Sequence, residues 1–157
     1  MSQNSYSEIN LHYVWHTKES RPLLTPDVEE FVHRYLKGRL INTPGVYVHE
    51  VNGTENHVHV VVSIAPTVDI AELVGQMKGS SSHEANKQFS RRGKVLAWQD
   101  GYGVVSFGTG DLEWVKAYVR NQKEHHARGT IHDRLERITA LEPPREVTAE
   151  AEPRETP

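Results

Sequence analysis

Polar and apolar residues alternate over residues 9–16, the period-two pattern of a strand with one buried face. One face would carry Ile9, Leu11, Tyr13 and Trp15, and the other Asn10, His12, Val14 and His16. Strand-like segments recur at 46–51 and 57–64, and residues 52–56 between them contain the Asn-Gly pair of a hairpin. Two short strands are predicted over 95–98 and 104–107, on either side of a glycine-rich turn.

Apolar residues at helical spacing predict helices between and after these strands. Thr25 is a favoured N-cap, Pro26 suits the first helical position, and an apolar stripe continues from Val28 to Leu40. The other predicted helices are one that opens at 66–67, a short one from the capping box at 81–84 to about residue 90, a long one over 110–128 and a last short one near 130–138.

The order of these elements predicts the fold class. Strand, helix, hairpin, helix, strand and helix are typical of an α+β domain of ferredoxin-like type, with helices packed on an antiparallel sheet. A long C-terminal helix would follow the sheet. A chain of 157 residues has the size of one domain, and we assign residues 1–141 to it. Residues 142–157 hold five acids, two arginines and four prolines, so we expect them to form a disordered tail.

Composition excludes several kinds of site. The chain has no cysteine, which rules out disulfides, thiolate metal sites and thiol nucleophiles. The net charge of −3 excludes an overall basic surface for nucleic acid but leaves room for a local one. The N-terminus lacks the pattern of a secretory signal, and no apolar stretch has the length of a bilayer crossing. We therefore expect a cytoplasmic protein without membrane segments.

A His-x-His pair, His57 and His59, opens one of the predicted strands. Residues two apart in a strand face the same side with Cα atoms about 6.5–7 Å apart, so two imidazoles can converge on one metal ion. Val58 and Val60 would then face the core. Taken alone, such a pair is more often two surface histidines on an exposed sheet face, and a metal site needs a third ligand from elsewhere.

Polar and aromatic residues share one face of the long predicted helix. Trp114, Tyr118, Gln122 and His125 recur at intervals of four, four and three residues. The apolar stripe of Leu112, Val115 and Val119 is the natural core contact, which places Tyr118 and Gln122 beside each other at its edge. A single tyrosine at such a boundary more often covers the rim of a core than reacts.

A basic segment follows at 78–94, with five basic residues against one acid. The candidates for DNA binding are the basic residues Lys78, Lys87, Arg91, Arg92 and Lys94 and the nearby aromatic residues Trp98 and Tyr102. Basic groups attract phosphates, and exposed rings stack on unpaired bases, so the combination suits single-stranded nucleic acid. A solvated helix face explains the charges alone equally well.

Several blocks of sequence together resemble a known family. They are L-H-Y-V-W-H-T-K at 11–18, H-V-H at 57–59, Q-M-K-G-S-S at 76–81, W-Q-D-G-Y-G-V-V-S-F at 98–107 and Y-V-R-N-Q-K-E-H-H at 118–126. In this order they resemble the single-tyrosine HUH transposases of the insertion-sequence 200/605 type. The resemblance extends over about residues 8–138. The acidic, proline-rich tail is not part of that family pattern.

The resemblance implies specific roles. Tyr118 matches the nucleophile, His57 and His59 match the metal-binding histidines, and Gln122 matches the third ligand. A mixed imidazole and oxygen site suits Mg²⁺ or Mn²⁺. The family also implies a homodimer that binds single-stranded DNA hairpins at element ends and cleaves and rejoins the strand through a 5′-phosphotyrosine. Whether the tyrosine acts in its own subunit or in the partner cannot be read from the sequence.

Two other functions remain open at this point. A zinc hydrolase could use His57 and His59 with His125 or His126 and would need no tyrosine. A domesticated or repeat-associated protein could bind hairpins of nucleic acid with the same fold, with or without cleavage. Activity after Tyr118→Phe would separate the hydrolase from the transposase.

Overall fold

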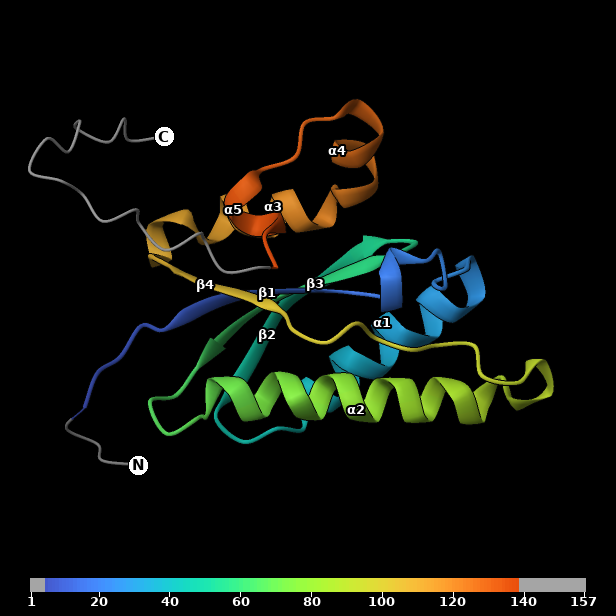
Figure 1. Ribbon diagram of the computed structural model, residues 1–157. Helices are drawn as coiled ribbons and strands as arrows, with labels where there is room; N and C mark the ends of the chain where they lie inside the picture. Colours follow the sequence, from blue (N-terminus) through green and yellow to red (C-terminus); the bar gives the residue numbers. More distant parts are fainter. Residues whose placement is uncertain (1–4, 139–157) are drawn as a thin grey trace, which may run out of the picture.

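The computed structural model describes residues 5–138. One antiparallel sheet with the strand order β2-β3-β1-β4 lies between two layers of helices. The strands are β1 (Asn10–His16), β2 (Val46–Thr54), β3 (His57–Ile64) and β4 (Gly103–Phe107). Helices α1 and α2 cover one face, and α3, α4 and α5 lie on the other (Figure 1). The order β1-α1-β2-β3-α2-β4 is that of a ferredoxin-like fold and confirms the predicted α+β class.

Five α-helices and three short 3-10 helices are present among the described residues. The α-helices are α1 (Pro26–Ile41), α2 (Ile70–Gln88), α3 (Leu112–Arg120), α4 (Gln122–Arg128) and α5 (Asp133–Glu136). The 3-10 helices are η1 (Lys18–Ser20), η2 (Ser90–Arg92) and η3 (Thr109–Asp111). Helix α1 begins as predicted, with Thr25 at the N-cap and Pro26 at the first position.

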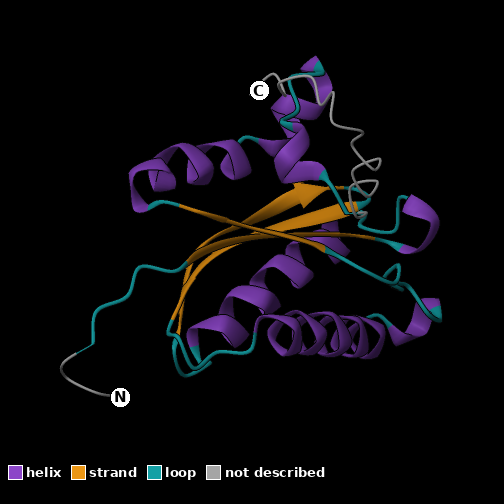
Figure 2. Cartoon of the chain, turned by 60° about the vertical axis from the view of Figure 1, so that its left-hand side comes forward, coloured by secondary structure: helices purple, strands orange, loops and turns teal. Residues whose placement is uncertain are grey.

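The larger core fills the space between the sheet and the helices α1 and α2 (Figure 2). Its sheet side includes Leu11, Tyr13 and Trp15 of β1, as the alternation predicts. Val58 and Val60 of β3 are completely buried in it. Burial of an aliphatic side chain stabilises a fold by about 1.5–3 kcal/mol, so this face holds β3 firmly in register.

A smaller apolar cluster lies on the opposite face, under α3 and α5. Its buried members are Val61, Val115, Tyr118, Val119 and Leu135. Val115 and Val119 were predicted as the core stripe of their helix, and the structure confirms this. This cluster sets α3 and α5 against the sheet face that does not contact α1 and α2.

Besides the long C-terminal helix, four local predictions were wrong. Helix α2 begins at Ile70 with Asp69 as its N-cap, and not at residues 66–67. The separate helix predicted to start at 81–84 is absent, because α2 continues through Ser81 to Gln88. The Ser81 side chain is buried, and its hydroxyl donates to the carbonyl oxygen of Lys78 in the preceding turn. Residues 95–98 form no ladder strand and make only the isolated bridge between Trp98 and Thr17. The hairpin is tighter than predicted, because β2 extends to Thr54.

The predicted long C-terminal helix is divided in two. Asn121 ends α3 with φ −100° and ψ 23°, and α4 begins at Gln122. The backbone N–H of Asn121 donates to the carbonyl oxygen of Ala117 at 3.1 Å, which closes the last turn of α3. Tyr118 and Gln122 therefore lie on either side of a break instead of on one straight face.

The predicted tail at 142–157 and the domain boundary at 141 lie outside the described residues. Within residues 5–138, no helix has both the length and the apolar character that a bilayer crossing requires.

Candidate metal centre and nucleophile

The two histidines of β3 lie next to each other on the sheet face opposite the larger core. His57 and His59 point away from Val58 and Val60 because alternate residues of a strand face opposite sides. Their side chains are 2% and 0% exposed, respectively. The ring centroids are 4.9 Å apart. The strand therefore brings the predicted pair together in a buried position, which is unlike a pair of surface histidines.

Each of these histidines has a partner at its Nδ1 atom. His57 Nδ1 lies 2.8 Å from Thr54 Oγ1 and 2.7 Å from Asn56 Oδ1, at the hairpin that precedes the strand. His59 Nδ1 lies 2.7 Å from Nε2 of the buried His12 on β1. Partners at Nδ1 fix the ring orientation and leave Nε2 of both histidines for the site, as in metal-binding histidines.

Helices α3 and α4 bring Tyr118 and Gln122 to the same position. Gln122 is fully buried, and its Oε1 lies 3.3 Å from His57 Nε2. The Tyr118 ring packs edge-on against His59, with centroids 6.3 Å apart. The four residues predicted from the sequence therefore converge within one chain.

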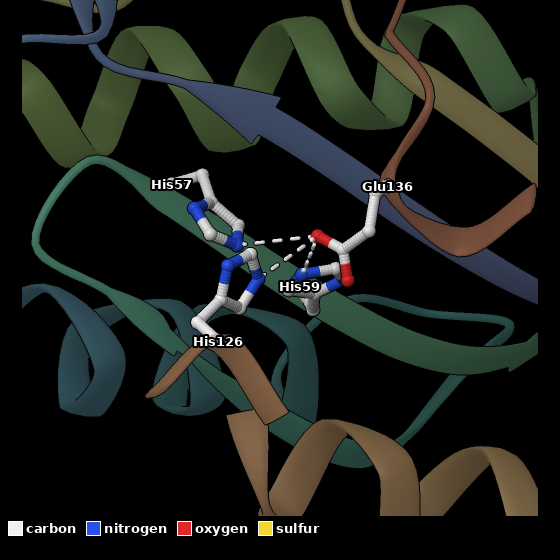
Figure 3. Close-up of side chains that lie close together, drawn as sticks. All are labelled: His57, His59, His126 and Glu136. Atoms are coloured by element: carbon white, nitrogen blue, oxygen red, sulfur yellow. Dashed lines mark hydrogen bonds and ion pairs between the residues drawn. The ribbon is translucent and has the colours of Figure 1, made fainter. Parts of the chain in front are cut away.

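The structure adds two residues that the predicted transposase site did not contain. Glu136 of α5 reaches the cluster from the far end of the described chain, and His126 reaches it from α4 (Figure 3). Glu136 Oε1 lies 3.3 Å from His57 Nε2, 3.0 Å from His59 Nε2 and 3.3 Å from His126 Nε2. The other carboxylate oxygen, Oε2, accepts hydrogen bonds from the Tyr118 hydroxyl and from Gln122 Nε2.

Helix α5 is held against the sheet by contacts of the residues before Glu136, and the residue after it lies against β4. Leu135 is buried in the smaller apolar cluster, and Arg134 donates to the carbonyl oxygen of Ser106 on β4. A side chain at Gly103 would begin 1.9 Å from the carbonyl oxygen of Arg137. Only glycine therefore allows β4 and the end of α5 to approach this closely.

The donor atoms of this cluster fit a divalent metal ion. Ligands that share an ion at about 2.1 Å lie about 3.0–3.4 Å apart in octahedral or tetrahedral geometry. The contacts of Glu136 with His57 and His59, at 3.3 and 3.0 Å, fall within that range. His59 Nε2 is buried and has no hydrogen-bond partner among the described residues, because its short contact with Glu136 lacks hydrogen-bond geometry. A buried nitrogen without a partner that points at other donors is typical of a metal ligand.

Comparison with protein families identifies the chain at this point. The family model described as "Transposase IS200 like" matches residues 5–122, which contain the His-x-His pair, the tyrosine and the glutamine. The chain belongs to the IS200-like transposase family. Membership supports a DNA-cleaving and rejoining enzyme, and the family together with the His/Glu cluster suggests that a metal takes part. No curated protein matches the chain in a sequence search.

Solved structures share the fold of this IS200-like transposase. A presumed transposase of Deinococcus radiodurans R1 aligns with a TM-score of 0.61 at 18% identity and covers 78% of this chain and 96% of its own. A REP-associated tyrosine transposase, solved bound to a REP hairpin, aligns with a TM-score of 0.56 at 14% identity and covers 83% of this chain and 76% of its own. At these identities the likeness establishes the fold.

Burial and the central carboxylate set the electrostatics of the transposase site. Burial, followed by the hydrogen bond to Glu136, raises the pKa of Tyr118 to about 12. Burial lowers the pKa of His59 to about 4, although Glu136 partly opposes this. Burial would raise the pKa of Glu136, but its contacts with His57 and His59 outweigh that effect and hold it well below its usual value. The site therefore holds a carboxylate and a protonated phenol at neutral pH.

The basic residues predicted to bind DNA are outside this cluster, around α2 on the other face of the sheet. Lys78 donates to the carbonyl oxygens of Gln99 and Gly101 at 2.7 and 2.8 Å, which ties α2 to the loop before β4. Arg92 forms an ion pair with Asp27. Lys87, Arg91 and Lys94 are exposed.

The aromatic candidates Trp98 and Tyr102 are partly buried against the larger core. Trp98 packs edge-on to Trp15 with centroids 5.8 Å apart, and its Nε1 donates to Ser81 Oγ at 3.0 Å. The backbone N–H of Gln99 donates to the carbonyl of His16, whose ring stacks 5.0 Å from that of His57. The segment around Trp98 thus borders the cluster of His57, His59, His126 and Glu136, while Tyr102 packs beside Tyr13.

The two neighbouring histidines of α4 lie differently. His126 joins the cluster, whereas His125 stacks on Tyr118 with ring centroids 4.6 Å apart and bonds to Thr130. His126 was considered in the sequence only as a third ligand for a hydrolase. Glu136 was missed entirely, because α5 has four residues and offers no periodic pattern. The one residue whose type reflects the position of Glu136 is Gly103, because the backbone after α5 lies too close to it for a side chain.

Proposed function

We propose that this transposase cleaves and rejoins single-stranded DNA with Tyr118 as its nucleophile. One observation carries the proposal: Tyr118 and Gln122 meet His57 and His59 of the same chain, with Glu136 Oε2 bonded to both helix residues. A phenol, two imidazoles whose Nε2 atoms face the site and an amide oxygen are the groups that a metal-assisted transesterification requires.

We propose that His57, His59 and Gln122 hold Mg²⁺ or Mn²⁺. Such an ion supplies positive charge that stabilises a phenolate and the charge that develops on a phosphate. The chain's own residues orient the reactants: His57 and His59 are fixed by their Nδ1 partners, and Tyr118 is fixed by bonds to Glu136 and to the backbone N–H of His132 at 2.8 Å.

In the proposed reaction the Tyr118 oxygen attacks the phosphorus of a phosphodiester. The new bond joins that oxygen to phosphorus, and the bond from phosphorus to the 3′ oxygen breaks. The phenolic proton ends on the released 3′ hydroxyl through solvent. One phosphate ester replaces another, so the 5′-phosphotyrosine can be attacked by a 3′ hydroxyl and the strand rejoined without ATP.

The proposed substrate is a single strand that carries hairpins. The phosphate must reach a tyrosine that is only 3% exposed, and a free strand can bend into such a site more easily than a duplex. The REP-associated relative bound to its hairpin supports hairpin binding here. We propose that the basic residues of α2 and η2 contact the DNA backbone, because phosphate contacts position DNA without reading its sequence. We also propose a homodimer, on the basis of the family resemblance.

A labelled strand tests the proposal. A hairpin oligonucleotide from the DNA that flanks the gene is labelled at its 3′ end and incubated with protein and Mn²⁺. A 5′-phosphotyrosine keeps the 3′ label on the protein through denaturing electrophoresis, whereas a 5′ label leaves with the free strand. Tyr118→Phe should abolish the adduct and retain hairpin binding, and Tyr47→Phe at a tyrosine that is 68% exposed should change neither. A full adduct from Tyr118→Phe would remove Tyr118 from this role.

Two other functions have a specific observation in their favour. His126 Nε2 lies 3.3 Å from Glu136 Oε1 within the cluster, which provides the third histidine of a zinc hydrolase. Hydrolysis by Tyr118→Phe at the rate of the unchanged protein would favour it. The similarity to the REP-associated transposase favours a second alternative, in which this protein acts on repeat hairpins of the chromosome and does not move an element of its own. Imperfect palindromes at both ends of the flanking DNA would favour the autonomous element.

A further inference from the structure

Hydrogen bonding at His57 determines which ring nitrogen carries the proton. His57 Nδ1 lies 2.7 Å from Asn56 Oδ1. The orientation of that amide follows from its other bonds, because Oδ1 accepts from Thr54 Oγ1 at 3.1 Å and Nδ2 donates to Ser20 O at 3.4 Å. An amide oxygen only accepts hydrogen bonds, so neutral His57 carries its proton on Nδ1 and a lone pair on Nε2.

Two more acceptor atoms face that lone pair. Gln122 Oε1 and Glu136 Oε1 each lie 3.3 Å from His57 Nε2. In this neutral form the lone pairs converge without a proton between them and repel one another. A positive charge among them, either a proton on Nε2 or a metal ion, converts the repulsion into attraction. The buried His59 Nε2 has no hydrogen bond within residues 5–138, and it points into the same space, 3.0 Å from the same Glu136 oxygen.

We propose that Glu136 is an anionic ligand of the metal centre and that His126 is its third imidazole ligand. This inference rests on the metal proposed above for His57 and His59. A single oxygen, Glu136 Oε1, is 3.0–3.3 Å from the Nε2 atoms of all three histidines. These four residues offer ligand atoms that all lie within 4.8 Å of one another. No motif in the sequence assigns either residue to the family's metal site.

A carboxylate ligand changes the charge of the centre. Two imidazoles and an amide are neutral, so His57, His59 and Gln122 alone leave the full charge of a divalent ion uncompensated. Glu136 adds one negative charge, which raises the affinity for the ion because affinity depends on the charge of the ligands. Gln122 Nε2 donates to Glu136 Oε2 at 3.3 Å and so orients the carboxylate.

The same carboxylate joins the metal to the nucleophile. Glu136 Oε1 faces the three histidines, and Glu136 Oε2 accepts the hydrogen bond of the Tyr118 hydroxyl. Filling the centre would therefore also fix the position of Tyr118. Helix α5, which the family match at 5–122 does not reach, becomes part of the active site.

Calorimetric titration of Mn²⁺ into the metal-free, full-length protein tests this inference. Glu136→Gln keeps the shape of the side chain and removes its charge, and we expect Mn²⁺ to bind about tenfold more weakly or worse. His126→Asn should also weaken binding. Asp133→Asn is the matched control, because Asp133 lies on the same helix with a side chain that is 81% exposed and pairs only with Arg137 among the described residues. The control should bind Mn²⁺ as the unchanged protein does.

His59→Ala separates failure of this inference from failure of the proposed metal centre. If His59→Ala loses Mn²⁺ affinity and Glu136→Gln retains it, Glu136 pairs with the histidines only as an ion pair and the inference is wrong. If both variants retain it, the metal centre itself is wrong. The absorption spectrum of bound Co²⁺ gives a second readout, and its ligand-field bands should shift in Glu136→Gln but not in Asp133→Asn.

Discussion

The hydroxyl of Tyr118 donates a hydrogen bond to the carboxylate of Glu136, and the same carboxylate lies 3.0 Å from Nε2 of His59. The proposed nucleophile and a proposed metal ligand are therefore linked through one side chain. Burial and this hydrogen bond raise the pKa of Tyr118 to about 12, so the phenol stays protonated at neutral pH. Positive charge beside the carboxylate would favour ionisation of the Tyr118 phenol.

We predict that His59→Ala abolishes Mn²⁺-dependent cleavage and that millimolar Mn²⁺ does not restore it. The change would remove the buried Nε2 atom that the proposal assigns to the metal ion. Gln122→Ala should reduce the rate less, because water can replace a neutral amide ligand. Cleavage rates over a Mn²⁺ series measure both effects. Normal cleavage by His59→Ala would contradict the metal assignment.

His12 should act as a positioning residue for His59. Its Nε2 lies 2.7 Å from His59 Nδ1, and both side chains are buried. We expect His12→Phe to weaken Mn²⁺ binding about 10–100-fold, as for other partners of metal-binding histidines. His12→Gln, which keeps an acceptor, should recover part of the loss, and hairpin binding should stay the same in both variants. Equal losses of Mn²⁺ affinity in the two variants would indicate that His12 only packs against His59 and does not orient it.

A mixture of Tyr118→Phe and His59→Ala should be no more active than the two variants measured separately. The helices that carry Tyr118 and Gln122 are attached to their own chain. Asn52 Nδ2 of β2 donates to the carbonyl of Arg120 at the end of α3 at 2.8 Å, and Lys123 of α4 pairs with Glu29 of α1 at 2.8 Å. We therefore expect each chain to complete its own site. Adduct formation by the mixture would show that a dimer exchanges its tyrosines between subunits.

Stability should decrease as pH falls from about 6.5 to about 4, partly because of His33. This histidine of α1 has an Nε2 atom that is buried without a hydrogen-bond partner among the described residues. Burial, with smaller effects of Lys123 and Lys37, lowers its pKa from 6.5 to about 4. Between these two pH values the unfolded chain binds the proton and the folded chain does not. The free energy of unfolding therefore decreases as the pH decreases.

His33→Gln should remove part of this dependence. Urea unfolding at pH 7.5 and pH 5.0 measures the difference in stability between the two conditions. That difference should be smaller in the variant by about 1–2 kcal/mol. An equal difference in the variant and the unchanged protein would assign the pH dependence to other histidines.

Four residues of the site could be predicted because their positions depend on the local periodicity of one strand and one helical segment. Alternation along β3 placed His57 and His59 opposite the core valines, and the three- and four-residue spacing placed Tyr118 beside Gln122. The break at Asn121 could not be predicted, because apolar residues continue at helical spacing up to Val119 and the polar face continues past it.

Glu136 could not be predicted for a different reason. Its position depends on Leu135 packing into the smaller apolar cluster and on the absence of a side chain at Gly103. Both are contacts between segments far apart in the sequence. The continuous helix α2 has a similar cause, because Ser81 has the form of an N-cap but its hydroxyl accepts the Trp98 indole N–H.

Strand β3 pairs with β1 on one side and with β2 on the other, so it cannot shift along either neighbour without breaking two ladders. A slip by one residue would turn His57 and His59 into the aliphatic interior and expose valines in their place. Misplaced imidazoles are therefore penalised during folding itself. Any chain that reaches the native sheet already has its histidine pair assembled, before DNA or an ion is present.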